Sequence, residues 1–189
     1  MNRIQWTALT ALGLACGLTG GVLLGMPLGK ILNAMIVTAA VTCAVGAILG
    51  SFQAIGLRRL LRRPAWWIVA TVIGLGIGLA VAVITVEQSG ILITGHRPQL
   101  AHLSTPVRAI SFVVLGLVAG TILGTAQWLV IRRQMPGVRR WIPSTAIGLA
   151  VALSASSLVA DFSGLGPIAF VALAGILFGA LTSRPLRSV

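Results

Sequence analysis

Long apolar stretches separated by short polar segments make up almost the whole chain. Each stretch runs for roughly 20 residues, the length that an α-helix needs to cross the hydrocarbon core of a bilayer. The pattern predicts six spans, at about residues 4–26, 31–57, 66–86, 107–131, 141–160 and 166–183. The predicted fold is therefore all-α, a polytopic membrane helix bundle that forms a single transmembrane domain over residues 1–189.

A motif recurs in the odd-numbered spans and indicates an internal repeat. It consists of a Trp, a Thr, a Gly and a further small residue at helical spacing, which places all four positions on one helix face. The three copies are Trp6, Thr10, Gly13 and Gly17; Trp67, Thr71, Gly74 and Gly78; and Trp141, Thr145, Gly148 and Ala152. We expect the Trp side chain at the cytoplasmic membrane interface, and the small residues where another helix packs closely.

A second motif of two glycines, a polar residue and an arginine marks the even-numbered spans. Its copies are Gly46, Gly50, Gln53 and Arg58; Gly120, Gly124, Gln127 and Arg132; and, more weakly, Gly175, Gly179, Thr182 and Arg187. An offset of 74 residues superimposes the first two copies. The repeats predict three tandem parallel hairpins, at about residues 1–60, 61–135 and 136–189, arranged with approximate threefold symmetry about the membrane normal.

The distribution of basic residues predicts the orientation in the membrane. The chain is 57% hydrophobic and only 8% charged, and eleven of its 14 basic residues fall on the side that also holds the amino terminus. Because basic residues concentrate in short cytoplasmic loops, both termini are predicted to be cytoplasmic, in a bacterial inner membrane. The net charge of +12 follows from this topology and does not indicate nucleic acid as a partner.

Two arginine clusters follow the second and fourth spans. They are Arg58, Arg59, Arg62 and Arg63, and Arg132, Arg133, Arg139 and Arg140. Such clusters at an inner leaflet attract anionic lipid headgroups, and an acidic surface of a larger membrane complex is a second kind of partner. Membrane topology alone also accounts for them, so both interpretations stay open.

Four polar side chains are candidates for a solute site. Glu87 and Asp161 are the only acidic residues, and the 74-residue offset also relates them, at the outer ends of the third and fifth spans. They could bind a cation or accept protons, or they could cap helix ends and pair with Lys30, Arg97 or Arg108. Gln53 and Gln127 could form a solute filter, but a Gln between membrane helices usually supplies a hydrogen bond.

The remaining polar residues offer little for catalysis. His96 and His102 lie in the long outer loop at 87–106, without the dense ligand spacing of a metal site, so no metal is expected. Two acids and two histidines in total also supply almost no material for acid–base chemistry, so we expect neither an enzyme nor a bound cofactor, although pigment or quinone between helices stays open. Cys16 and Cys43 are expected to be buried packing residues rather than a disulfide.

Two strings resemble a pattern found in bacterial multi-pass membrane proteins that have no assigned function. They are GTILGTAQWLVIRR at 120–133 and WIPSTAIGLA at 141–150, and the resemblance covers mainly residues 46–79 and 120–153. It implies a membrane bundle and no activity. The sequence therefore favours a non-catalytic accessory or stabilising subunit that contacts lipids or a larger complex. The alternative is a transporter or channel for a small solute or cation, which requires a continuous polar path through the bundle.

Overall fold

The computed structural model describes residues 3–30, 33–94, 104–134, 138–159 and 166–183. These residues form six α-helices and one short 3-10 turn, with no strand among them, so the predicted all-α class is confirmed for this part of the chain. The helices are α1 (Arg3–Leu28), α2 (Ala34–Leu57), α3 (Pro64–Thr94), α4 (Thr105–Ile131), α5 (Trp141–Val159) and α6 (Gly166–Thr182), and the 3-10 turn is η2 (Val138–Arg140).

Helices α1 to α4 are each long and apolar enough to cross a membrane, with 23 to 27 residues in the apolar segment. Helices α5 and α6 contain shorter apolar segments within the described residues, Trp141–Ala155 and Leu173–Thr182. Large aliphatic side chains also face outward, for example Ile73, Ile77 and Ile84 of α3, which are 52%, 53% and 57% exposed. A surface of this kind is suited to lipid rather than to water, so the fold defines a membrane-type helix bundle.

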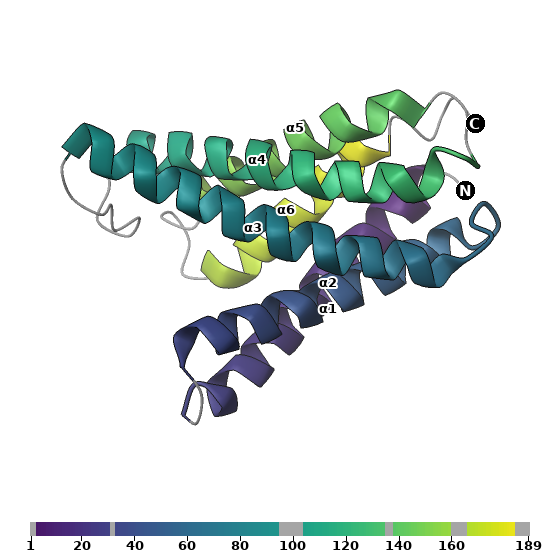
Figure 1. Cartoon of the computed structure of the whole chain (residues 1–189), viewed down its shortest axis with the longest axis horizontal. Coiled ribbons are helices and arrows are strands. Elements are labelled where there is room, and N and C mark those ends of the chain that lie inside the picture. The colour runs from purple at the N-terminus through teal and green to yellow at the C-terminus, as the bar shows by residue number, and fades with distance from the viewer. Residues whose placement is uncertain (1–2, 31–32, 95–103, 135–137, 160–165, 184–189) are drawn as a thin grey trace.

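Each helix packs against the next one along the chain, and α6 packs against α1, so that the six helices form a closed ring. The start of α1, the end of α6 and the α2–α3 connection lie at the same end of the bundle (Figure 1). We call this end, which also carries Arg58, Arg59, Arg132 and Arg133, the basic end. Toward the opposite end, the α1–α2 hairpin diverges from α3 and α4 (Figure 1).

Helix α3 continues to Thr94, well past the predicted end of the third span at residue 86. The residues that follow Glu87 include the apolar run Ile91-Leu92-Ile93, and Pro98 is the first proline after them, so the segment has no strong helix breaker. Glu87 therefore lies inside a helix, half-buried, and not at a helix end. Asp161, His96, His102 and Arg97 fall outside the described residues.

The two cysteines are free and exposed, which corrects the expectation of buried packing residues. On α1 the buried face holds Trp6, Thr10, Gly13 and Gly17. Cys16 directly precedes Gly17, so the helical rotation of about 100° per residue turns it away from this face. Position along the span could predict a membrane depth for these thiols but not the direction in which they point.

Candidate functional site

Three tryptophans meet in the interior of the basic end. Trp6, Trp67 and Trp141 are 0%, 0% and 1% exposed. The ring centroid of Trp141 lies 5.8 Å from that of Trp6 and 5.5 Å from that of Trp67, with interplanar angles of 73° and 75°. This is the edge-to-face geometry that aromatic pairs prefer. The motif face points into the helix ring, so these side chains are buried against one another, while their depth in a membrane stays a prediction.

Each indole N–H in this tryptophan layer donates a hydrogen bond to an even-numbered helix. Trp67 Nε1 donates to Gln53 Oε1 at 3.3 Å, and Trp141 Nε1 donates to Gln127 Oε1 at 3.1 Å. Trp6 Nε1 donates to Thr182 Oγ1 at 3.0 Å, which joins the two ends of the chain. The same contact thus occurs at three helix pairs: α2–α3, α4–α5 and α6–α1.

Gln127 also connects two of these pairs. Its Nε2 donates to Gln53 Oε1 at 3.3 Å and to Thr71 Oγ1 at 3.1 Å. Gln53 and Gln127 are each only 1% exposed, so their amide groups are committed to partners within the bundle. Thr10, which corresponds to Thr71 in the repeat, is the contrasting case, because its buried hydroxyl has no hydrogen-bond partner in the structure.

The motif glycines lie at close approaches between neighbouring helices. On the even-numbered helices, a Cβ at Gly46, Gly120 or Gly175 would come within 2.9, 2.7 or 2.8 Å of the Cα atom of Val72, Ala146 or Ala11, respectively. Gly50, Gly124 and Gly179 continue these contacts one turn further along, against Thr71, Thr145 and Thr10. On the odd-numbered helices, Gly13, Gly17, Gly74, Gly78 and Gly148 contact the even-numbered helix that follows. The same backbone approach therefore recurs around the ring.

One close approach was missed in the sequence. A Cβ at Gly116 of α4 would overlap the backbone of Ala150 on α5. The 74-residue offset maps Gly116 onto Thr42 rather than onto a glycine, so the repeat gave no signal for this position. Helices α4 and α5 consequently approach each other over three successive glycines of α4: Gly116, Gly120 and Gly124.

A central cavity of about 410 Å³ lies among all six helices, lined almost entirely by aliphatic side chains. Two sets of leucines recur in its wall at fixed distances after the motif tryptophans, namely Leu14, Leu75 and Leu149, and Leu18, Leu79 and Leu153. Leu49, Leu123 and Phe178 add a third set, one turn before Gln53, Gln127 and Thr182 on the even-numbered helices. Among the described residues that line the cavity, Thr38 and Thr42 of α2 are the only ones with polar side chains.

The cavity is not sealed, because the lining residue Thr38 is exposed, so the hydrocarbon that surrounds a membrane helix bundle can reach it. Water is a poor occupant, because buried water needs two to four polar partners that this lining does not supply.

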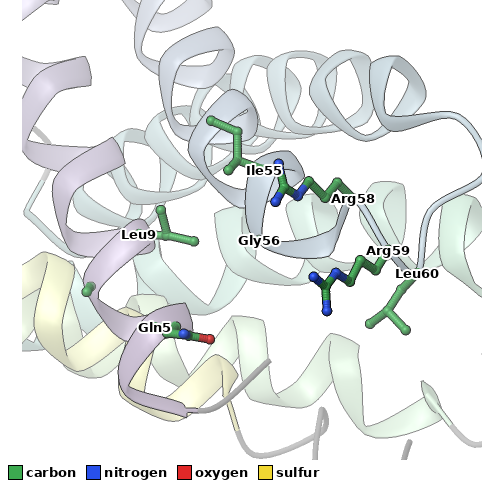
Figure 2. Close-up of a pocket in the computed structure, with 8 residues that line it drawn as sticks. Gln5, Leu9, Ile55, Gly56, Arg58, Arg59 and Leu60 are labelled. Carbon is green, nitrogen blue, oxygen red and sulfur yellow. The ribbon is translucent and has the colours of Figure 1, made fainter.

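Two further pockets lie at the basic end. Leu60 lines both of them. The first, of about 720 Å³, lies between α1 and the end of α2 and is lined by Gln5, Ala8, Leu9, Ile55, Gly56, Arg58, Arg59 and Leu60. Figure 2 shows the guanidinium groups of Arg58 and Arg59 extending toward α1, where Gln5 and Leu9 lie. The second, of about 840 Å³, is lined by Leu60, Arg62, Arg63, Trp66, Leu129, Val130, Arg133 and Gln134. Arg59 of the first pocket corresponds to Arg133 of the second by the 74-residue offset.

Arg132 and Arg140 are not among the residues that line these two pockets. The guanidinium of Arg132 lies 5.2 Å from the ring centroid of Trp128, within cation–π range. Gln134 Oε1 accepts a hydrogen bond of 2.9 Å from the backbone N–H of Arg62, which ties the α2–α3 connection to the end of α4. Arg140 is exposed at the end of η2, and the side chain of Arg139 lies outside the described part of the structure.

Comparisons with protein-family models, curated proteins and solved structures find no match to this chain. Within the described residues, no group of three or more His, Cys, Asp or Glu side chains gathers as a metal site would require. Glu87, on α3, is the predicted carboxylate that the structure describes, and it does not line the central cavity. The geometry therefore brings together the tryptophans, the two glutamines and the glycines, but it does not join Glu87 to them.

Proposed function

We propose that the chain is a non-catalytic integral membrane protein that acts as an accessory or stabilising subunit. In this proposal all six helices cross the bilayer as three equivalent units, and both termini are cytoplasmic. The observation that carries the proposal is the buried tryptophan layer, in which Trp6, Trp67 and Trp141 contact one another and donate hydrogen bonds to the three even-numbered helices. The interior polar groups are used for contacts between helices. This supports a rigid bundle whose role is to stabilise or anchor other subunits of a membrane complex.

The orientation is supported by the clustering of basic side chains at one end of the bundle. Arg58 and Arg59 directly follow α2, Arg132 and Arg133 directly follow α4, and all four are exposed. Arginines in short loops favour the cytoplasmic side of a membrane. The tryptophan layer then lies in the cytoplasmic half of the bundle, and the central cavity lies further toward the outer leaflet.

The transporter alternative has less support from the geometry. It requires a polar path that begins at Gln53 and Gln127, yet Gln127 already donates from Nε2 and accepts at Oε1 within the bundle. Beyond the glutamines, the axis widens into a cavity with an aliphatic wall. An ion or polar solute in that cavity would lose its hydration without gaining hydrogen bonds, which is a severe free-energy cost.

The two basic-end pockets support contact with anionic lipid headgroups. Each brings arginine side chains next to apolar helix surface, which matches a phosphate group joined to its hydrocarbon chains. Replacing Arg59 and Arg133 with Gln should reduce the amount of phosphatidylglycerol that co-purifies, measured by native mass spectrometry. Lys30→Gln, at the opposite end, is the matched control and should retain the wild-type amount. Equal loss in both variants would argue against specific headgroup pockets.

The accessory role is tested by the composition of the native particle. The protein is extracted from its own membrane under mild conditions, and the mass of the intact assembly is measured. Other polypeptides in fixed ratio to this chain would support the proposal and identify the complex it serves. A particle that contains only this chain and lipid would contradict the subunit role, and flux measurements in proteoliposomes would then test transport.

A further inference from the structure

We propose that the central cavity is a binding site for one acyl chain of a membrane phospholipid. This site goes beyond the proposed accessory role, and it would stand whether or not a partner complex exists. It concerns a cavity whose wall is built from all six helices. The headgroup pockets at the basic end lie elsewhere and are lined by different residues.

The chemistry of the wall selects a hydrocarbon. The recurring leucines, represented by Leu14, Leu75 and Leu149, surround the cavity from α1, α3 and α5. Within the part of the lining that the structure describes, Phe178 is the single aromatic residue, and Thr38 and Thr42 are the only hydroxyl-bearing residues. A ligand with carbonyl groups or a conjugated ring system usually needs a few well-placed polar groups to fix its orientation. A flexible saturated chain needs none.

The shape of the cavity suits a chain that enters from one side. Its lining on α2 runs from Leu49 to Val37, so it extends nearly to the start of that helix at the end opposite the tryptophan layer. Thr38 is exposed, which places it at the mouth of the cavity. In the same region the α1–α2 hairpin diverges from α3 and α4 (Figure 1). A lipid could therefore keep its headgroup outside while one chain enters between α2 and its neighbours.

The size of the cavity suits part of one acyl chain. At about 410 Å³ it falls within the range of roughly 300–1,000 Å³ that is usual for small-molecule sites. In the proposed site one chain enters the cavity, and the second chain of the lipid stays in the bilayer.

The test uses a phospholipid that carries a photoreactive diazirine near the end of one acyl chain. The full-length protein is reconstituted into phosphatidylethanolamine–phosphatidylglycerol vesicles with a small fraction of this lipid, irradiated, digested and mapped by mass spectrometry. We expect cross-links at cavity residues such as Leu75, Leu79 and Leu149. Cross-links confined to outward-facing residues such as Ile73 and Ile77 would overturn the proposal.

A pair of matched variants tests the site independently. Leu75→Trp together with Leu149→Trp places two larger side chains in the wall of the cavity, one from α3 and one from α5. Ile73→Trp together with Ile147→Trp makes the same changes two residues away on the same helices, at side chains 52% and 51% exposed. The first pair should show a several-fold loss of the remaining cavity cross-links, and the second pair should show none. Comparable cross-linking in both pairs would contradict the site.

The identity of the ligand is checked by extracting the purified protein with organic solvent and identifying the extracted small molecules by mass spectrometry. Phospholipid alone, together with cavity cross-links in the wild-type protein, supports an acyl chain. A quinone or pigment present in a one-to-one ratio would overturn the assignment to phospholipid. The wild-type cross-links need no substitution, so the proposal stays testable even if the cavity-filling variant fails to fold.

Discussion

The contact between α4 and α5 gives the sharpest test of the packing. In Gly120→Ala the new Cβ would lie 2.7 Å from the Cα atom of Ala146 and 2.8 Å from the carbonyl oxygen of Thr145. Both are backbone atoms, which cannot rotate away, so α4 and α5 must move apart. Overpacking of this kind costs about 1–3 kcal/mol. The higher helix propensity of Ala returns up to about 1 kcal/mol, so we expect a net destabilisation.

Gly76 on α3 is the matched control, because a Cβ placed there meets nothing within 4 Å. Gly76→Ala should therefore stabilise the protein by about 0.5–1 kcal/mol through helix propensity alone. The free energy of unfolding of both variants is measured by titrating SDS into mixed micelles and recording tryptophan fluorescence. The two substitutions should shift it in opposite directions. A gain in Gly120→Ala equal to that in Gly76→Ala, or an equal loss in both variants, would refute the packing account.

Two further pairs of substitutions test the polar contacts at the basic end. Gln127→Leu removes three interhelical hydrogen bonds, each worth about 0.6 kcal/mol in a membrane protein, so it should lower the unfolding free energy by about 2 kcal/mol. Thr121→Val, whose hydroxyl bonds only to Leu117 O in its own helix, should change it little; similar losses would contradict the network. Thr71→Val should destabilise in the same titration because it removes the acceptor for Gln127, whereas Thr10→Val should be neutral or stabilising because its hydroxyl has no partner. A larger loss at Thr10 than at Thr71 would be the contrary result.

The sequence could predict the helices and their shared faces but not the direction of those faces. Helical spacing groups Trp6, Thr10 and Gly13 on one face, and it is equally compatible with an interfacial tryptophan and a buried one. The recurring separation of 14 residues between Gln53 and Trp67, and between Gln127 and Trp141, is the signal that could have revealed their hydrogen bonds.

The third occurrence of the contact was hidden for two reasons. Thr182 stands where the other copies have Gln, and its partner Trp6 lies 176 residues away at the other end of the chain. The predicted hairpin repeat pairs α1 with α2, whereas the recurring tryptophan hydrogen bond pairs α6 with α1. The central cavity could not be predicted from the sequence, because aliphatic side chains line cavities and also face lipid. Leu75 lines the cavity and Ile73, two residues earlier, faces outward, yet both are aliphatic.

The central claim is that six helices close into a ring around three buried, hydrogen-bonded tryptophans. Its most direct test is the exchange of indole N–H protons in protein labelled with ¹⁵N only at tryptophan, which gives one resonance for each of the five tryptophans. The resonances of Trp6, Trp67 and Trp141 should exchange slowly with deuterated water, whereas Trp66, which is 57% exposed, should exchange quickly. Thr182→Val should shift the Trp6 resonance more than those of Trp67 and Trp141, because it removes the acceptor of that indole. If Trp6 exchanges as fast as Trp66 in the unsubstituted protein, α6 and α1 do not close the ring and the account is wrong.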